Sequence, residues 1–214
     1  GATIKFINSI AKLRQITMFY EDYREYSSRE LLDFVVSVLV LGFAFSYSYI
    51  VHRVFILIPA SIIGVASSFV VHELAHRSVA RANGVYARYR AWYIGLLLAL
   101  ILTIATQGRF LFAAPGAVVV YPTWYSPEVE MTIAMAGPVA NIIIGFICLA
   151  LSIPMYGIAY QYLRIIGGIN AFIALFNSLP IPPLDGYKVF KINVTRWIIL
   201  FIPSLILWFI YWLS

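Results

Sequence analysis

The chain has 214 residues, of which 62% are hydrophobic and only 11% are charged. A soluble domain carries about twice that charged fraction, so the composition excludes an ordinary soluble globular protein and indicates an integral membrane protein. The single cysteine, Cys148, excludes a disulfide framework and a cysteine metal cluster. The net charge of +6 does not indicate nucleic-acid binding, because no basic patch is interleaved with stacking aromatic residues.

Residues 1–30 are mixed and charged, and we expect them to form a cytoplasmic or interfacial segment ahead of a single transmembrane domain at 31–214. Apolar residues recur near helical spacing between Ile4 and Ile16, which fits an amphipathic helix on the membrane surface. A plain helix packed on the transmembrane bundle is the alternative. No secretory signal peptide is recognisable here.

Five apolar stretches are long enough to cross a bilayer, which predicts an all-α polytopic membrane protein of the cell membrane. The expected spans lie at about 31–50, 54–79, 128–152, 160–179 and 197–213.

The segment 91–127 is harder to place. Residues 91–106 are apolar but few for a spanning helix, and residues 110–121 have the pattern of a strand, a Pro-Gly turn and a β-branched strand. If the segment dips into the membrane and returns, 13 of the 15 Lys and Arg residues are cytoplasmic, and only Arg53 and Arg164 lie outside. If 91–106 crosses, the cytoplasmic count falls to ten. The positive-inside rule therefore favours a membrane-dipping, β-rich re-entrant segment and a cytoplasmic N-terminus, with six helices as the alternative.

The motif His72-Glu73-Leu74-Ala75-His76 ends the second expected span. Histidines four apart lie on one face of a helix and can take adjacent corners of a tetrahedral zinc, with the glutamate between them near a zinc-bound water. The motif lies about 7 Å below the interface that Arg77 marks. The alternative role for Glu73 is an ion pair with Arg77, four residues on.

Catalytic zinc usually has three protein ligands and one open position. His52 lies about 30 Å from His72 along a helix, at the opposite face of the membrane. The carboxylates on the expected side are Asp185, just after the fourth span, and Glu128 and Glu130, at the start of the third.

Two further motifs follow in the chain: AGPVAN at 136–141, and FNSLP at 176–180 with PLDG at 183–186. Together with the histidine motif they resemble the site-2 protease family of intramembrane zinc metalloproteases, over about residues 54–190. The compact core is similar to that of prokaryotic members, archaeal ones included. The resemblance implies one Zn²⁺ per chain held by His72, His76 and Asp185, in a three-helix catalytic core near the cytoplasmic side of the membrane.

The resemblance also implies an activity: hydrolysis of peptide bonds in or near transmembrane segments of membrane-anchored proteins. The expected partners are these substrates and the lipid bilayer, with no nucleic acid, and the sequence carries no signal for an oligomeric state. Glu73 is the expected general base. Asn177 is the first candidate for a donor to the oxyanion by resemblance and Asn141 is the second, although either could simply join two helices. A strand edge within 110–121 either binds unwound substrate by strand addition or plugs the bundle.

Two alternatives remain from the sequence. A prenyl-protein peptidase would want a glutamate as third ligand. A zinc transporter or sensor would use the same ligands without hydrolysis and would not need Glu73.

Overall fold

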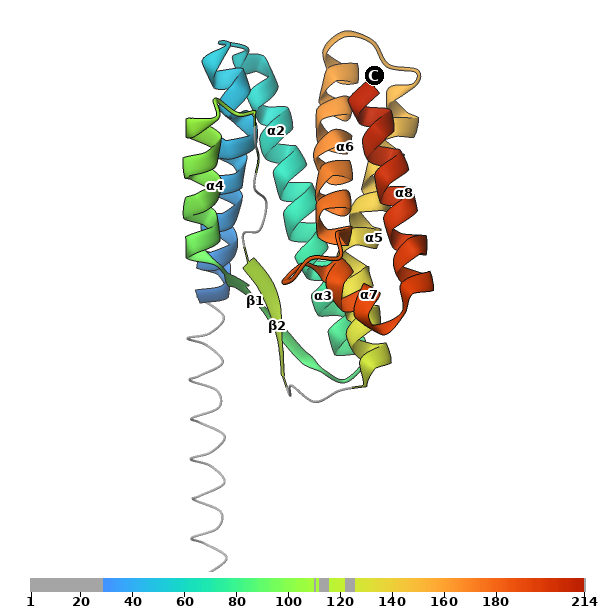
Figure 1. Cartoon of the computed structure of the whole chain (residues 1–214). Coiled ribbons are helices and arrows are strands. Elements are labelled where there is room, and N and C mark those ends of the chain that lie inside the picture. The colour runs from blue at the N-terminus through green and yellow to red at the C-terminus, as the bar shows by residue number, and fades with distance from the viewer. Residues whose placement is uncertain (1–28, 110, 112–115, 122–125, 214) are drawn as a thin grey trace, which may run out of the picture.

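The computed structural model describes residues 29–109, 111, 116–121 and 126–213. Within them, five helices are long and apolar enough to cross a membrane, which confirms the all-α polytopic architecture (Figure 1). The amphipathic helix expected before residue 17 lies outside the described residues. The five helices are Arg29–Val51 (the first helix), Phe55–Ala82, α5 (Pro127–Ser152), α6 (Gly157–Ser178) and α8 (Val194–Leu213).

The second span, which carries the histidines, is not one regular helix. It consists of a 3-10 turn (Phe55–Leu57), α2 (Ile58–Val65), a π-helical turn η2 (Ala66–Val70) and α3 (Val71–Ala82). The π turn adds one residue to the helical repeat directly before the histidine motif. Such π bulges are rare and occur mostly at functional sites.

Helix α5 contacts α3, α6, α7 (Asp185–Ile192) and α8 and lies at the centre of the group that these helices form (Figure 1). Small residues allow these helices to approach closely. A Cβ atom on Gly167 of α6 would run into the Tyr211 side chain and lie 2.8 Å from Cβ of Cys148. The Tyr211 hydroxyl donates to the carbonyl oxygen of Gly145 at 2.8 Å, which ties α8 to α5.

The two strands, β1 (Tyr86–Ala91) and β2 (Gly116–Tyr121), form an antiparallel pair in which Tyr86 lies opposite Tyr121. The expected hairpin within 110–121 is therefore wrong in its pairing, because the partner of β2 comes from before α4. Residues 110 and 112–115, the rest of that expected hairpin, lie outside the described residues. No strand was predicted at 86–91, where Arg88 and Arg90 were counted only as cytoplasmic charges. In fact Ala87 and Tyr89 point into the core and alternate with Arg88 and Arg90, which are partly exposed.

Between the strands, α4 (Tyr93–Ala105) runs beside the first helix, and the chain then returns to pair β2 with β1 (Figure 1). The segment therefore begins and ends at the same end of the molecule, as the re-entrant prediction requires. It is less β-rich than expected, because its apolar part is a helix of 13 residues. Such a helix is about 20 Å long, whereas the hydrocarbon core of a bilayer is about 30 Å thick.

Two carboxylates of the first helix cover the outer edge of β1. Glu30 Oε1 accepts the Tyr89 N–H at 2.9 Å, and Asp33 Oδ2 accepts the Ala91 N–H at 3.2 Å. Asp33 Oδ1 also accepts the Tyr93 hydroxyl at 2.6 Å. An uncovered strand edge invites pairing with another chain. The first helix therefore covers the outer edge of β1, and β2 pairs with the other edge of β1.

The contact of Gly167 with Tyr211 predicts a cost for one added methyl group. We expect Gly167→Ala to destabilise the protein by about 1–3 kcal/mol, since overpacking displaces Tyr211 from Gly145. The measurement is the thermal unfolding midpoint in detergent. Gly168→Ala is the matched control, because a Cβ there comes no closer than 3.6 Å to Tyr211. Equal midpoints for the two variants would contradict this account of the packing.

Candidate metal centre

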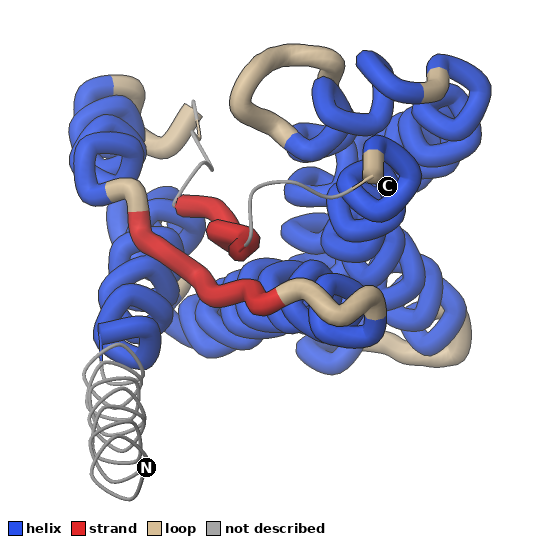
Figure 2. The backbone as a smooth tube through the Cα atoms, turned by 90° about the horizontal axis from the view of Figure 1, so that it is seen from below, coloured by secondary structure: helices blue, strands red, loops and turns tan. Residues whose placement is uncertain are grey.

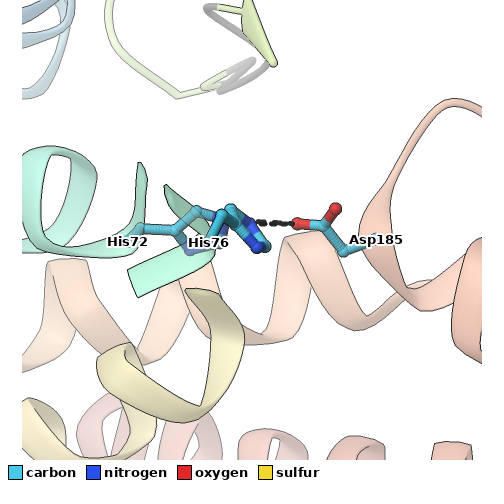
Figure 3. A group of neighbouring side chains, drawn as sticks. All are labelled: His72, His76 and Asp185. Atoms are coloured by element: carbon cyan, nitrogen blue, oxygen red, sulfur yellow. Dashed lines mark hydrogen bonds and ion pairs between the residues drawn. The ribbon is translucent and has the colours of Figure 1, made fainter. Parts of the chain in front are cut away.

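His72 and His76 lie one turn apart on α3, and Asp185 is the first residue of α7. Their side chains converge (Figure 3): the Nε2 atoms of His72 and His76 lie 3.2 and 3.0 Å from the same oxygen, Asp185 Oδ2. One potential ligand atom from each residue lies within 4.8 Å of the others. All three side chains are buried. The fold thus brings together the three residues expected to hold zinc.

The other nitrogen of each imidazole is held by an acceptor. His72 Nδ1 lies 2.6 Å from Asn141 Oδ1, and His76 Nδ1 lies 2.6 Å from the carbonyl oxygen of Ile133. A carbonyl oxygen can only accept, so His76 carries its proton on Nδ1. With the same Nδ1 proton on His72, the neutral imidazoles that bind a metal direct both Nε2 lone pairs at the centre of the group. Oxygen acceptors behind the ligating histidines are the usual arrangement at zinc sites.

Gly137 of α5 provides the space in front of these nitrogens. A Cβ atom at this position would lie 2.5 Å from Nε2 of His72, 2.6 Å from its Cδ2, and in collision with Nε2 of His76. Any other residue would therefore fill the volume that a metal needs. Two imidazole nitrogens and a carboxylate oxygen, buried around such a space, fit a catalytic zinc with one open position.

Asp185 has a separate partner for each carboxylate oxygen. Oδ2 faces the histidines, while Oδ1 accepts from Lys188 Nζ at 3.0 Å. Burial by itself would raise the pKa of the Asp185 carboxyl, but His76, Lys188 and the two imidazole contacts hold that pKa well below its usual range. The ligand is therefore ionised, as metal binding requires. Lys188 was missed in the sequence, where its position three residues after Asp185 on a helix was the available signal.

The backbone next to Asp185 is held against the end of α6. A Cβ atom on Gly186 would collide with the Ser178 carbonyl group and lie 2.7 Å from Leu179 O. The glycine of the PLDG motif thus lets α7 begin in contact with α6, which places Asp185 opposite α3.

Glu73 is buried, and its Oε2 atom has no hydrogen-bond partner among the described residues. Glu73 lies between the two histidines on α3, directly after His72, so its side chain starts beside the metal centre. The alternative, an ion pair with Arg77, is not found: Arg77 Nη1 instead lies 3.4 Å from Glu30 Oε1. An unsatisfied carboxylate oxygen in a membrane span is costly, which indicates a functional group.

Asn141 is fully buried and uses all its hydrogen-bonding groups within the protein. Its Nδ2 donates to Ser68 O at 2.8 Å and to Asn170 Oδ1 at 3.0 Å, while Oδ1 accepts from His72. With both amide hydrogens engaged, Asn141 is arranged to position His72, and this geometry speaks against its donating to an oxyanion. Asn170 extends the network to Ser67 Oγ at 3.1 Å and was not singled out in the sequence.

The remaining residues considered in the sequence lie outside this group of three. Asn177, on the last turn of α6, donates one amide hydrogen to Ile173 O at 3.1 Å and keeps a second. Glu128 and Glu130 lie in the first turn of α5 and do not join the group of three. His52 lies at the other end of the second span, as expected.

The fold and this centre define a multi-pass membrane metalloprotease. The model of peptidase family M50 matches residues 60–160. MJ0611 of Methanocaldococcus jannaschii is 41% identical over 191 residues, covering 87% of this chain and 97% of that protein. YwhC of Bacillus subtilis is 31% identical over 153 residues, covering 63% of this chain and 69% of that protein. The names of both describe them provisionally as zinc metalloproteases.

Rip2 of Mycolicibacterium smegmatis carries the same description and is 29% identical over 150 residues, 63% of this chain and 56% of its own length. No solved structure shows a significant match. The chain belongs to peptidase family M50, the site-2 protease family.

The position of Gly137 predicts that a single methyl group blocks the centre. We expect Gly137→Ala to lower bound zinc from about one per chain to below about one tenth, because its Cβ would occupy the space in front of both Nε2 atoms. Zinc content of the purified protein is the measurement. Val139→Ala, two residues on at a site 37% exposed, is the control and should retain zinc. Full zinc occupancy in Gly137→Ala would mean that the metal binds elsewhere.

The hydrogen bond from His72 predicts a second effect on zinc. Asn141→Leu removes the acceptor at similar size, and we expect a 10- to 100-fold loss of zinc affinity, measured by competition with a chelator. Asn141→Asp keeps an acceptor for Nδ1 and should recover most of the loss. Asn177→Leu is the control, since Asn177 bonds Ile173. An unchanged affinity in Asn141→Leu would remove the positioning role.

Proposed function

We propose that the protein is an intramembrane zinc endopeptidase that cleaves membrane-anchored proteins in or near their transmembrane segments. One observation carries the proposal. Glu73 is a buried carboxylate with one oxygen unpartnered among the described residues, and it lies beside the buried group of His72, His76 and Asp185. The helix that carries Glu73 is apolar enough to span a membrane. A zinc transporter or sensor would need the ligands but would have no use for this carboxylate.

His72, His76 and Asp185 would hold the zinc. When bound, zinc supplies Lewis acidity, which polarises a peptide carbonyl and makes water more acidic. Glu73 takes a proton from the attacking water and then delivers it to the leaving amine. The second amide hydrogen of Asn177 is the candidate donor to the oxyanion. Lys188 holds Asp185 ionised, and Asn141 holds His72 in the tautomer that binds metal.

The charge distribution supports a cytoplasmic position for the centre and for the N-terminus. Arg77 and Arg81 lie on α3, Lys188 and Lys191 on α7, and Arg196 at the start of α8, all at the end of the molecule that holds the zinc set (Figure 1). Lys and Arg concentrate on the cytoplasmic side of membrane proteins. Water would reach the centre from this side.

A helical substrate must unwind before its peptide bonds can be attacked, and β2 is placed to hold the unwound chain. The first helix already covers the outer edge of β1. Figure 2 shows β2 on the inner side of β1, between the first helix with α4 and the helices α5 to α8. β2 also contacts α3, which carries the histidines. Its inner edge pairs with no other strand in the described part of the chain, so a substrate added there would run past the metal centre.

The register identifies which β2 residues face that inner edge. Tyr89 and Ala91 direct their N–H groups to the first helix, so the alternate residue Arg88 pairs with its β2 neighbour, Val119. The N–H of Val120, one residue on, then points away from β1 toward the inner edge.

The base role of Glu73 has a direct test. We expect Glu73→Gln to retain zinc and to cleave a membrane-anchored reporter at least about a hundredfold more slowly, because the amide cannot accept the proton from water. Asp185→Ala should lose zinc, whereas Glu128→Ala should keep it, which separates the proposal from a peptidase with a glutamate ligand. Cleavage at the wild-type rate by Glu73→Gln would overturn the protease and favour a zinc transporter or sensor.

Strand addition is tested by removing one N–H from the inner edge of β2. We expect Val120→Pro to keep zinc and the pairing with β1 but to lower reporter cleavage at least about tenfold, because the lost bond serves the substrate. Val120→Ala keeps the N–H and is the matched control. A proline at position 119 would instead disrupt the pairing with Arg88. If Val120→Pro and Val120→Ala cleave equally well, the edge does not bind substrate.

A further inference from the structure

A cavity separate from the zinc centre lies toward the opposite end of the molecule. It has a volume of about 520 Å³ and lies among the end of the first helix, the start of the second span, the first half of α6 and the end of α8. Its walls are largely aromatic and aliphatic, and the charged side chain among them is that of Arg164. The residues used below are Phe45, Leu57, Arg164, Gly168, Phe172 and Tyr211.

The Arg164 guanidinium is held in a fixed position within this cavity. It lies 4.4 Å from the centre of the Tyr211 ring and donates one hydrogen bond to Ile210 O at 3.2 Å. Tyr211 is itself fixed, because its hydroxyl donates to Gly145 O and its ring end lies against Gly167. A guanidinium has five N–H donors in a planar fork, so most of them remain for a ligand.

No carboxylate among the described residues pairs with this charge. The sequence has no Asp or Glu between Asp33 and Glu73, between Glu130 and Asp185, or after Asp185. The elements around Arg164 come from these stretches, and the ion pairs of the described residues all lie at the zinc end. A charge on a membrane-spanning helix is costly and normally has a partner. The Arg164 guanidinium is therefore suited to bind an anion from outside the chain.

The level of Arg164 in the membrane indicates the kind of anion. Arg164 lies on the second turn of α6, about 10 Å along the helix from Gly157. Exposed aromatic residues flank this end, with Tyr156 86% exposed and Trp212 71% exposed. Tyr and Trp concentrate at the level of lipid headgroups. Arg164 lies within about two helical turns of that level, and its long side chain can reach a phospholipid phosphate there.

The lining of the cavity favours a lipid. A volume of about 520 Å³ accommodates a phosphate, a glycerol unit and the start of an acyl chain. Phe45, Leu57 and Phe172 supply the apolar wall for the chain.

We propose that this cavity binds one anionic phospholipid, with its phosphate on the Arg164 guanidinium and its first acyl carbons against Phe45 and Phe172. The site is separate from the zinc centre and does not depend on the proposed protease activity.

Native mass spectrometry of the full chain in detergent tests the site, with phosphatidylglycerol and phosphatidylcholine of equal chain length as probes. We expect wild type to retain one phosphatidylglycerol at least about fivefold more strongly than phosphatidylcholine, and Arg164→Gln to lose that preference. Arg164→Lys should keep part of it. Arg53→Gln, at the same end of the molecule but outside the cavity lining, is the matched control and should bind as wild type does.

A second variant guards against a folding defect in Arg164→Gln. A Cβ on Gly168 fits beside Tyr211, so Gly168→Leu should keep Arg164 and zinc while its longer side chain fills the cavity and abolishes retention of the lipid. Equal binding of the two lipids by wild type, or unchanged preference in both cavity variants, would overturn the proposal. Displacement of the lipid by millimolar inorganic phosphate would show that the site binds simple anions, which contradicts the lipid proposal. Binding of an acidic transmembrane peptide in place of the lipid would show that the cavity binds substrate, which also contradicts the lipid proposal.

Discussion

The close approach of α5 to α3 is the constraint on which the metal-binding half of the molecule, formed by α3 and α5 to α8, depends. At Gly137 the two helices are so near that the imidazoles of His72 and His76 lie against backbone, and this leaves a space of the size of a metal ion. The same approach lets α5 supply both acceptors behind the histidines, the Ile133 carbonyl and the Asn141 amide. Helix α5 thus sets the tautomers and orientation of the two imidazoles and the space in front of them, whereas α7 supplies Asp185.

The first helix and the sheet form the other half, and here polar contacts to backbone replace apolar packing. Glu30 and Asp33 accept strand N–H groups that would otherwise be unpaired. Leaving such groups unsatisfied in an apolar environment costs several kcal/mol each, so the carboxylates make a strand possible at the edge of the bundle. Because they bind the outer edge, only the inner edge of the sheet is left for a peptide. Tyr89 then anchors β1 in the core beside Phe69 and Leu41.

The sequence predicted the spans well, because runs of apolar residues are strong local signals. The histidine pair and, by resemblance, the PLDG motif also pointed to the three residues that the fold brings together. The pairing of β2 was not predictable in the same way, because it joins Tyr86–Ala91 to residues 25 to 35 positions away. The support behind the ligands was only partly visible. Asn141 was singled out as a possible oxyanion donor or helix contact, and the structure shows its contact with His72. Asn170 was missed because tertiary contacts define its partners, whereas Lys188, three residues after Asp185, had a local signal.

The carboxylates of the first helix also set how often that helix can separate from the sheet. Their three hydrogen bonds to Tyr89, Ala91 and Tyr93 would all be lost if that helix moved away from the sheet. Hydrogen bonds to charged groups contribute about 1.5 kcal/mol or more each, so the separated arrangement would be present in fewer than about one molecule in a thousand. Glu30 also contacts Arg77, next to His76, so such a movement would reach the metal-binding helix as well. In almost every copy, therefore, the first helix stays on the sheet, and an arrangement without these bonds needs another source of stabilisation.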